Sequence, residues 1–245
     1  MFHFFCMYHL VILPGWGGSH TTWQEFVAKA NAVFSKVTVV DLPCFGDEPC
    51  PPTVWGVEEY AQFAFERLRH FGSDFPLVLL GHSFGGQVAT YLVSQYPVRF
   101  AALILVGAAV VRPRHAIRRF FFGFGARLAR IMFLFFPFQK QKERLKKFFY
   151  ARFLHSDYAT TTGISRDIYQ NVIRQDMRAF LPSIAMPTLV VWGKKDKVTP
   201  VRHGKKMARL LPNATWVCIP NGRHGLHHHP TQAVLLRAIE EFLRL

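Results

Sequence analysis

Residues 77–92 read Leu-Val-Leu-Leu-Gly-His-Ser-Phe-Gly-Gly-Gln-Val-Ala-Thr-Tyr-Leu, and this stretch decides the fold. The apolar run at 77–80 predicts a buried strand, and the segment from 85 onward predicts a helix. Between them stands a G-x-S-x-G pattern centred on Ser83, in the strand–turn–helix context of a nucleophile elbow. Glycines flank the serine because larger side chains would collide at so sharp a turn. The pattern predicts that the Ser83 hydroxyl stands exposed above a sheet as a nucleophile.

A serine hydroxyl needs a neighbouring base, and that base needs an acid to orient it. Asp196 follows a strand expected at 188–192, and His224 follows a strand expected at 215–219. Both therefore lie on loops beyond the carboxyl ends of strands, where parallel sheets build their sites. Order and placement agree, so we predict the catalytic triad Ser83, Asp196 and His224.

Two simpler interpretations stand beside the triad. Asp196 has the setting of an ordinary turn aspartate, between lysines and close to a glycine. His224 belongs to a loop that holds three further histidines, His227, His228 and His229. No carboxylate or cysteine lies near these three in sequence, so we expect no metal site there.

The third requirement is an oxyanion hole, in which backbone N–H groups point to where negative charge develops. One donor is the residue after the nucleophile, here Phe84. The other is expected from the glycine-rich loop Pro14-Gly15-Trp16-Gly17-Gly18, which follows an apolar run at 10–13. The Trp16 N–H is our candidate.

These motifs resemble the α/β-hydrolase-fold esterases, and most the pimeloyl-carrier-protein methyl ester esterase subgroup. The resemblance rests on residues 9–16 (HLVILPGW), on 40–46 (VDLPCFG), on the elbow, and on the Asp196 and His224 loops. It implies that Trp16 lines the acyl pocket as well as donating its N–H. Two departures stand out: Pro14 replaces the usual histidine before Gly-Trp, and His82 replaces the usual tryptophan before the serine.

Strand-like and helix-like segments alternate along most of the chain, which favours a mostly parallel sheet with helices on both faces. Residues 112–183 interrupt the alternation and predict an inserted helical lid. We therefore expect an α/β-hydrolase core formed by residues 1–111 and 184–245. Strands are expected at 9–13, 37–41, 77–81, 101–106, 188–192 and 215–219, and helices at 22–34, 57–71, 85–96, 201–211 and 231–244.

The first part of the expected lid is strongly basic and rich in phenylalanine. Residues 112–152 hold twelve Lys or Arg and one acid, Glu143, and so contribute most of the net charge of +15. Three interpretations remain open: a solvated face over apolar packing, binding to an anionic membrane surface, or docking of an acidic carrier protein or substrate. Nucleic acid is not expected, because no binding module accompanies the charge. Phe148 and Phe149 are candidates for lining the substrate pocket.

Length and composition favour a single domain, since 245 residues with 50% hydrophobic content can fill one large core. The four cysteines have no metal or redox spacing. The first residues lack the features of a signal peptide. We therefore expect a cytoplasmic protein with reduced thiols.

Together the motifs predict a serine carboxylic-ester hydrolase that acts through an acyl-enzyme and needs no cofactor or metal. A Phe-rich lid favours small to medium apolar esters, and lactones suit the same machinery. Hydrolysis of C–C bonds in diketones and cofactor-free peroxidation use the same triad and stay open. The alternative from another class is a catalytically weak ligand receptor, or a membrane- or carrier-docking member of the fold.

Overall fold

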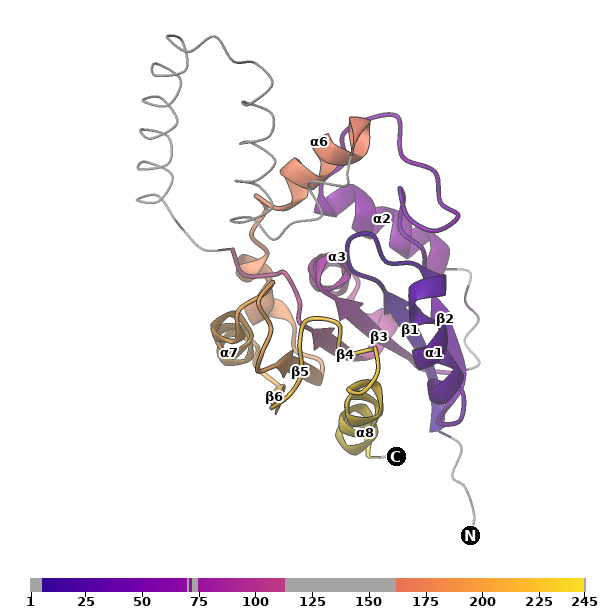
Figure 1. Ribbon diagram of the computed structural model, residues 1–245, viewed down its shortest axis with the longest axis vertical. Coiled ribbons are helices and arrows are strands. Elements are labelled where there is room, and N and C mark those ends of the chain that lie inside the picture. The colour runs from indigo at the N-terminus through magenta and orange to yellow at the C-terminus, as the bar shows by residue number, and fades with distance from the viewer. Residues whose placement is uncertain (1–5, 70, 72–74, 113–161, 245) are drawn as a thin grey trace. The chain divides into compact units, whose positions relative to one another are not determined.

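The computed structural model describes residues 6–69, 71, 75–112 and 162–244 (Figure 1). The chain divides into two compact units. One comprises Met1–Val111 with Thr162–Leu245, and the other comprises Arg112–Thr161. The first unit contains all the elements described below.

A six-stranded sheet forms the centre of this unit, and every recorded strand pair in it is parallel. The strand order is β2-β1-β3-β4-β5-β6, so the chain builds outward on one side of β1 before crossing to the other. β3 and β5 are buried along their whole length and read as continuous apolar runs, as expected of strands covered on both faces. The strands are β1 (Cys6–Leu13), β2 (Phe34–Val39), β3 (Leu77–His82), β4 (Phe100–Val106), β5 (Thr188–Gly193) and β6 (Ala214–Ile219).

Helices cover both faces of the sheet (Figure 1). α1 (His20–Ala30) and α8 (Gln232–Leu243) bury Trp23 and Leu235 in one apolar cluster. α2 (Val57–Leu68), α3 (Phe84–Gln95) and α7 (Val201–Leu210) contribute Tyr60, Leu92 and Met207 to the other. The 3₁₀-helix η1 (Pro97–Arg99) leads into β4. The predicted α/β arrangement is confirmed, with a doubly covered parallel sheet.

The compact unit resumes at Thr162, earlier than the core segment that we expected to begin at 184. The helix α6 (Gly163–Val172) and the 3₁₀-helix η3 (Arg178–Ser183) lie in this extra stretch. Gln87 of α3 donates hydrogen bonds from Nε2 to the carbonyls of Val172 (3.1 Å) and Gln175 (2.8 Å). Burial of Ile168 and Leu181 adds apolar contacts that sequence periodicity did not reveal. The rest of the predicted lid, 113–161, lies outside the described residues.

A disulfide joins Cys44 to Cys50 in the loop between β2 and α2, with their Cα atoms 4.1 Å apart. Our expectation of reduced thiols is therefore wrong for this pair. The two cysteines lie six residues apart, and the turns between Leu42 and Glu48 bring them together. Among the described residues, no helix has the length and apolar character needed to cross a membrane.

Candidate active site

The candidate site lies at the switch point of the sheet, where the chain stops adding strands on one side of β1 and continues on the other. β1 lies between β2 and β3, so the loops after β1 and β3 leave the carboxyl edge of the sheet side by side. Open α/β sheets bind their ligands in the crevice at such a switch point. The loop after β1 begins with Pro14-Gly15-Trp16, and the turn after β3 is Ser83. The sequence-predicted oxyanion loop and nucleophile therefore meet here.

Ser83 has the backbone geometry of a nucleophile elbow. Its φ is +51°, in a region that side-chain-bearing residues rarely adopt. A Cβ added at Gly85 would lie 2.1 Å from the Leu13 carbonyl oxygen, and one at Gly86 would lie 2.4 Å from the Ala108 Cβ. The start of α3 is therefore pressed against β1 and against the segment after β4, as the flanking glycines predicted. Strained backbone of this kind persists where the surrounding structure enforces it, commonly at functional sites.

Asp196 and His224 come together although 28 residues separate them. The Nδ1 atom of His224 lies 2.8 Å from Oδ2 of Asp196. The Asp196 side chain has no exposed surface, whereas the His224 side chain is 20% exposed. This is the arrangement in which a buried carboxylate fixes the tautomer of an imidazole and leaves Nε2 available for chemistry.

Thr199 completes the surroundings of the aspartate and was not identified from the sequence. Its backbone N–H donates to Asp196 Oδ1 (2.8 Å), and its Oγ1 lies 2.8 Å from Oδ2 and 3.0 Å from the Gly107 carbonyl. Val198 N–H also donates to Asp196 Oδ1 (2.8 Å). The tight turn Asp196–Thr199 thus holds the carboxylate on both oxygens. The available signal was Asp followed by Thr three residues later, a side-chain-to-backbone turn pattern.

Ser83 and His224 border the same short backbone segment after β4. Ser83 N–H donates to the Val106 carbonyl (3.0 Å), and Ala109 N–H donates to the Ser83 carbonyl (2.8 Å). A Cβ at Gly107 would lie 3.2 Å from His224 Nδ1. Among the described residues, no hydrogen bond is recorded between the Ser83 hydroxyl and His224. Hydrogen bonds between a nucleophile and its base are often long before substrate binds.

The candidate oxyanion donors lie on either side of the nucleophile. Gly15 approaches Ser83 so closely that a Cβ there would lie 3.1 Å from the Ser83 Cβ. Trp16 follows within a turn that the hydrogen bond from Gly18 N–H to the Gly15 carbonyl closes (2.9 Å). Phe84 is the first residue of α3, where N–H groups have no partner within the helix. Within the described part of the chain, no backbone carbonyl accepts from the N–H of Trp16 or of Phe84.

Aromatic side chains surround the oxyanion loop. The Trp16 ring packs edge-on against Phe45, Phe84 and Tyr169, with ring centroids 4.9, 5.4 and 4.9 Å apart. Tyr169 belongs to α6, a contribution that the sequence did not reveal. The other two predicted pocket residues, Phe148 and Phe149, lie outside the described residues.

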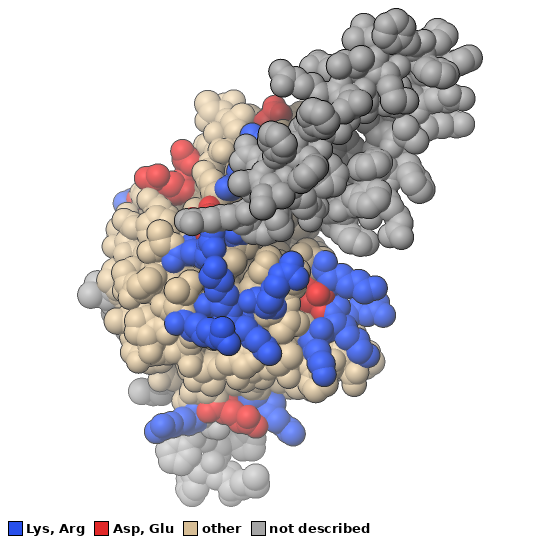
Figure 2. Space-filling view, turned by 90° about the vertical axis from the view of Figure 1, so that its left-hand side faces the viewer, with Lys and Arg blue, Asp and Glu red and all other residues tan. Residues whose placement is uncertain are grey.

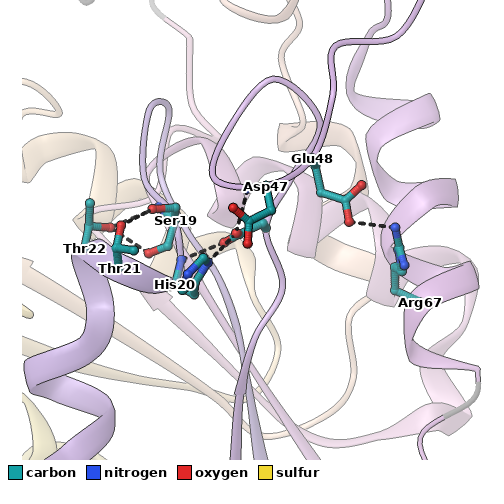
Figure 3. A network of polar contacts seen from close by, with 8 residues as sticks. Ser19, His20, Thr21, Thr22, Asp47, Glu48 and Arg67 are labelled. Atoms are coloured by element: carbon teal, nitrogen blue, oxygen red, sulfur yellow. Dashed lines mark hydrogen bonds and ion pairs between the residues drawn. The ribbon is translucent and has the colours of Figure 1, made fainter.

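The loop that carries Phe45 is fixed by polar contacts (Figure 3). Asp41 Oδ1 accepts from the His20 N–H, and Asp41 Oδ2 lies 2.6 Å from His20 Nδ1. Glu48 pairs with Arg67 of α2 at 2.6 Å. The hydrogen bond and the charge of Asp41 raise the pKa of the exposed His20. Together with the Cys44–Cys50 disulfide, these contacts hold Phe45 against Trp16.

A cluster of histidines lies beneath the candidate site. His82 is buried, and its Nε2 lies 3.1 Å from the His224 carbonyl, so it connects the elbow to the histidine loop. The His227 ring stacks on Trp23, with centroids 3.9 Å apart and planes within 6°. Burial and neighbouring histidines lower the pKa of His82 well below its usual range and that of His227 to about 3. Both rings are therefore neutral at pH 7. The position of His82 fits a structural role, in which its contact with the His224 carbonyl links the elbow to the histidine loop.

One group of side chains has the composition of a metal site. His20, Asp41 and Asp47 offer ligand atoms that all lie within 4.8 Å of one another. However, the Asp41 oxygens already accept from His20 and from the N–H groups of His20 and Asp47. These hydrogen bonds hold the loop after β2 against the start of α1, which explains why the three side chains lie close together. We assign no metal to them.

Comparison with known proteins places this geometry in a family. A family model described as the alpha/beta hydrolase fold matches residues 8–229. The Pimeloyl-[acyl-carrier protein] methyl ester esterase of Neisseria meningitidis serogroup C is 27% identical, over 94% of this chain and 92% of that protein. The Biotin biosynthesis bifunctional protein BioHC of Teredinibacter turnerae is 26% identical over 96% of this chain, which spans 44% of that longer protein.

Among solved structures, a thermophilic esterase from Thermogutta terrifontis superposes with a TM-score of 0.67 at 25% identity, covering 98% of this chain and 90% of that one. The chain belongs to the α/β-hydrolase fold family. Its broad class is a hydrolase of the α/β-hydrolase type, and the resemblance drawn from the sequence is confirmed at that level.

Proposed function

We propose that the protein is a serine carboxylic-ester hydrolase that acts on small to medium apolar esters, with lactones as a related class. One observation carries the proposal. A serine held at positive φ on the elbow borders the same backbone segment as a histidine whose Nδ1 lies 2.8 Å from a buried aspartate. The relatives named as esterases support the same class.

The proposed reaction follows from the positions of the groups. His224 Nε2 takes the proton from Ser83 Oγ as the oxygen attacks the ester carbonyl, and Asp196 stabilises the resulting imidazolium. The N–H groups of Trp16 and Phe84 bind the oxyanion of the tetrahedral intermediate. The alcohol leaves with the proton from His224, which then activates a water that releases the acid. The chain's own residues supply each of these roles.

The aromatic wall supports an apolar acyl group. Trp16, Phe45, Phe84 and Tyr169 present ring edges and faces beside the oxyanion loop. The name of the meningococcal relative gives an ester borne on an acyl-carrier protein as its substrate. By analogy, a carrier-borne ester is a second form of substrate here, and the basic segment 112–152 is the proposed contact for such a carrier or for an anionic membrane surface.

Turnover of p-nitrophenyl butyrate tests the proposal. The wild-type protein should release p-nitrophenol with a burst, and Ser83→Ala should abolish the burst and reduce turnover to the background rate. Ser94→Ala, in the same helix and away from the elbow, is the matched control and should keep the wild-type rate. Equal activity of Ser83→Ala and wild type would contradict the proposal and favour a ligand receptor.

The cytoplasm remains the proposed compartment, and the Cys44–Cys50 disulfide is the one described feature that points the other way. Disulfides persist in oxidising compartments and are rare in the cytosol. Fractionation of cells that produce the protein should recover it together with cytosolic marker enzymes. Recovery with markers of an oxidising compartment would contradict that location and agree with the disulfide.

A further inference from the structure

A basic surface lies on the described core, formed by residues outside the basic segment 112–152. Figure 2 shows Lys and Arg side chains gathered on the face of the molecule where α7 lies. We call it the α7 basic surface. Its members are all exposed and lie on α7, on the loop from β5 to α7, and on the loop after β6: Lys194, Lys195, Lys197, Arg202, Lys205, Lys206, Arg209 and Arg223.

The charge of this surface is not balanced within the described part of the chain. Asp196 is the single acid between residues 194 and 209, and its side chain has no exposed surface. The recorded ion pairs of the described residues involve none of the eight cations. Lys195 has a neutral partner, since its Nζ lies 3.0 Å from Asn221 Oδ1. The surface therefore presents an uncompensated positive field.

The spacing on α7 concentrates the charge along one side of the helix. Basic residues recur every three or four positions along α7, at Arg202, at Lys205 and Lys206, and at Arg209. The residues that face the core are Gly204 and Met207. Like charges at this spacing repel and weaken a helix. A stripe of this kind is therefore costly to the isolated protein, and an external anion relieves that repulsion.

The absence of apolar anchors favours a lipid partner over a protein. Protein interfaces depend on buried aromatic or aliphatic anchors at their centre. Of the described residues on this surface, Val198 is the one large apolar side chain that is strongly exposed, at 54%. An anionic headgroup layer needs no such anchors, because it attracts clustered Lys and Arg by its surface potential.

We propose that the α7 basic surface docks the protein onto an anionic phospholipid surface. Lys197 directly follows Asp196, and Arg223 directly precedes His224, so the docked face includes the rim of the candidate active site. This inference rests on the proposed function in one respect: it names the surface from which an apolar ester would reach that site.

Flotation with vesicles tests the proposal without any turnover. The wild-type protein should float with phosphatidylcholine vesicles that contain phosphatidylserine, and not with phosphatidylcholine alone. Binding should weaken as salt rises, because the screening length falls from about 30 Å at 0.01 M to about 10 Å at 0.1 M. We define the α7 triple variant as the protein with Lys205→Glu, Lys206→Glu and Arg209→Glu combined. It should bind roughly tenfold or more weakly than wild type, because each cation near such a surface contributes to binding.

The matched control reverses the same number of charges on the opposite face of the sheet. Lys29→Glu, Arg237→Glu and Arg244→Glu lie on α1 and at α8 and change the net charge equally. This control should bind within about twofold of wild type if position matters more than total charge. Should the α7 triple variant fail to fold, the glutamine triple variant at the same sites should still lose a smaller part of the binding.

Three outcomes would overturn the proposal. These are equal flotation with neutral vesicles, an equal loss in the control variant, and binding to poly-glutamate without binding to vesicles. The last would identify an acidic polypeptide as the partner. The Ser83→Ala protein should float like wild type, because docking does not need the nucleophile. The flotation test and the esterase test are therefore independent, and either proposal can fail while the other stands. Hydrolysis of a water-soluble ester should be the same in wild type and in the α7 triple variant.

Discussion

At the scale of single residues, the candidate site depends on how completely the Asp196 carboxylate is satisfied. It accepts from two backbone N–H groups and lies beside the Thr199 hydroxyl and the His224 imidazole. Hydrogen bonds to both oxygens fix the direction in which such a carboxylate points. The proposed role of Asp196 is therefore to orient His224, with Thr199 as its positioning residue.

Asp196→Asn should leave the fold intact and lower kcat by about four orders of magnitude, because an amide cannot hold the imidazole in the required tautomer. Steady-state kinetics with p-nitrophenyl butyrate measures the loss. Asp176→Asn, at a carboxylate that pairs with Arg178 and is not a member of the candidate triad, is the control. A loss below tenfold in Asp196→Asn would show that another carboxylate orients the base.

Thr199→Val should lower kcat roughly tenfold with little change in KM, since the carboxylate loses the Thr199 hydroxyl and gains freedom to turn. Thr199→Ser restores the hydroxyl and should recover most of the rate. A purely structural role for Thr199 would instead lower thermal stability in both variants and leave the rate per folded molecule unchanged. The comparison of kcat with melting temperature separates the two.

At the scale of elements, the start of α3 is tightly confined by the backbone of β1. Gly85 faces the carbonyl oxygens of Leu13 and Pro14 at the end of β1, where a Cβ would come within 2.1 and 2.3 Å. Backbone atoms cannot move aside as a side-chain end can. The strand–turn–helix unit thus fixes both the nucleophile and the neighbouring oxyanion loop.

Gly85→Ala should therefore lower the free energy of unfolding by about 1–3 kcal/mol, the usual cost of overpacking a filled site, and should also reduce activity by displacing Ser83. Gly56→Ala is the control, because a Cβ there would meet the end of the Gln175 side chain, which can move. Urea denaturation of the two variants measures the change in the free energy of unfolding. Equal stability of Gly85→Ala and wild type would contradict the close approach of α3 to β1.

Sequence periodicity predicted the strands and helices of the core to within a few residues. The largest errors are the helix expected at 22–34, which ends at Ala30, and the strand expected at 37–41, which is β2 at Phe34–Val39. The six strands and the helices that cover them carry continuous apolar runs or one-sided apolar faces, which are local signals. It did not place α6 and η3 in the core unit, because the hydrogen bonds from Gln87 to Val172 and Gln175, at the end of α6 and just after it, join residues more than 80 positions apart. The Cys44–Cys50 disulfide and the role of Thr199 likewise arise from turns whose geometry composition does not reveal.

At the scale of the whole molecule, buried histidines couple the stability of the fold to pH. Burial and the neighbouring Lys36 lower the pKa of His9 to about 4, and burial lowers that of His227 to about 3. An unfolded chain protonates these imidazoles near the ordinary value of 6.5. Between that value and the folded pKa, the unfolded state binds more protons than the folded state. Stability must therefore fall as the pH falls through this window.

Above about pH 6.5, these two histidines should contribute no pH dependence to the free energy of unfolding. From there toward pH 4 the free energy of unfolding should decrease, by up to about 1.4 kcal/mol per pH unit for each histidine. His227→Phe keeps the stacking on Trp23 and removes one titrating group, so its decrease should be shallower. A His227→Phe curve as steep as that of wild type would contradict the low pKa of His227.

The proposed function depends above all on Ser83 as the nucleophile. Incubation with a fluorophosphonate, followed by digestion and mass spectrometry, identifies the nucleophile, because the reagent bonds covalently to a serine activated by a neighbouring base. We expect one adduct, on the peptide that contains Ser83, with labelling lost in Ser83→Ala and strongly slowed in Asp196→Asn. Labelling that persists in Ser83→Ala on another serine, or no labelling of the folded wild-type protein, would show that Ser83 is not the nucleophile.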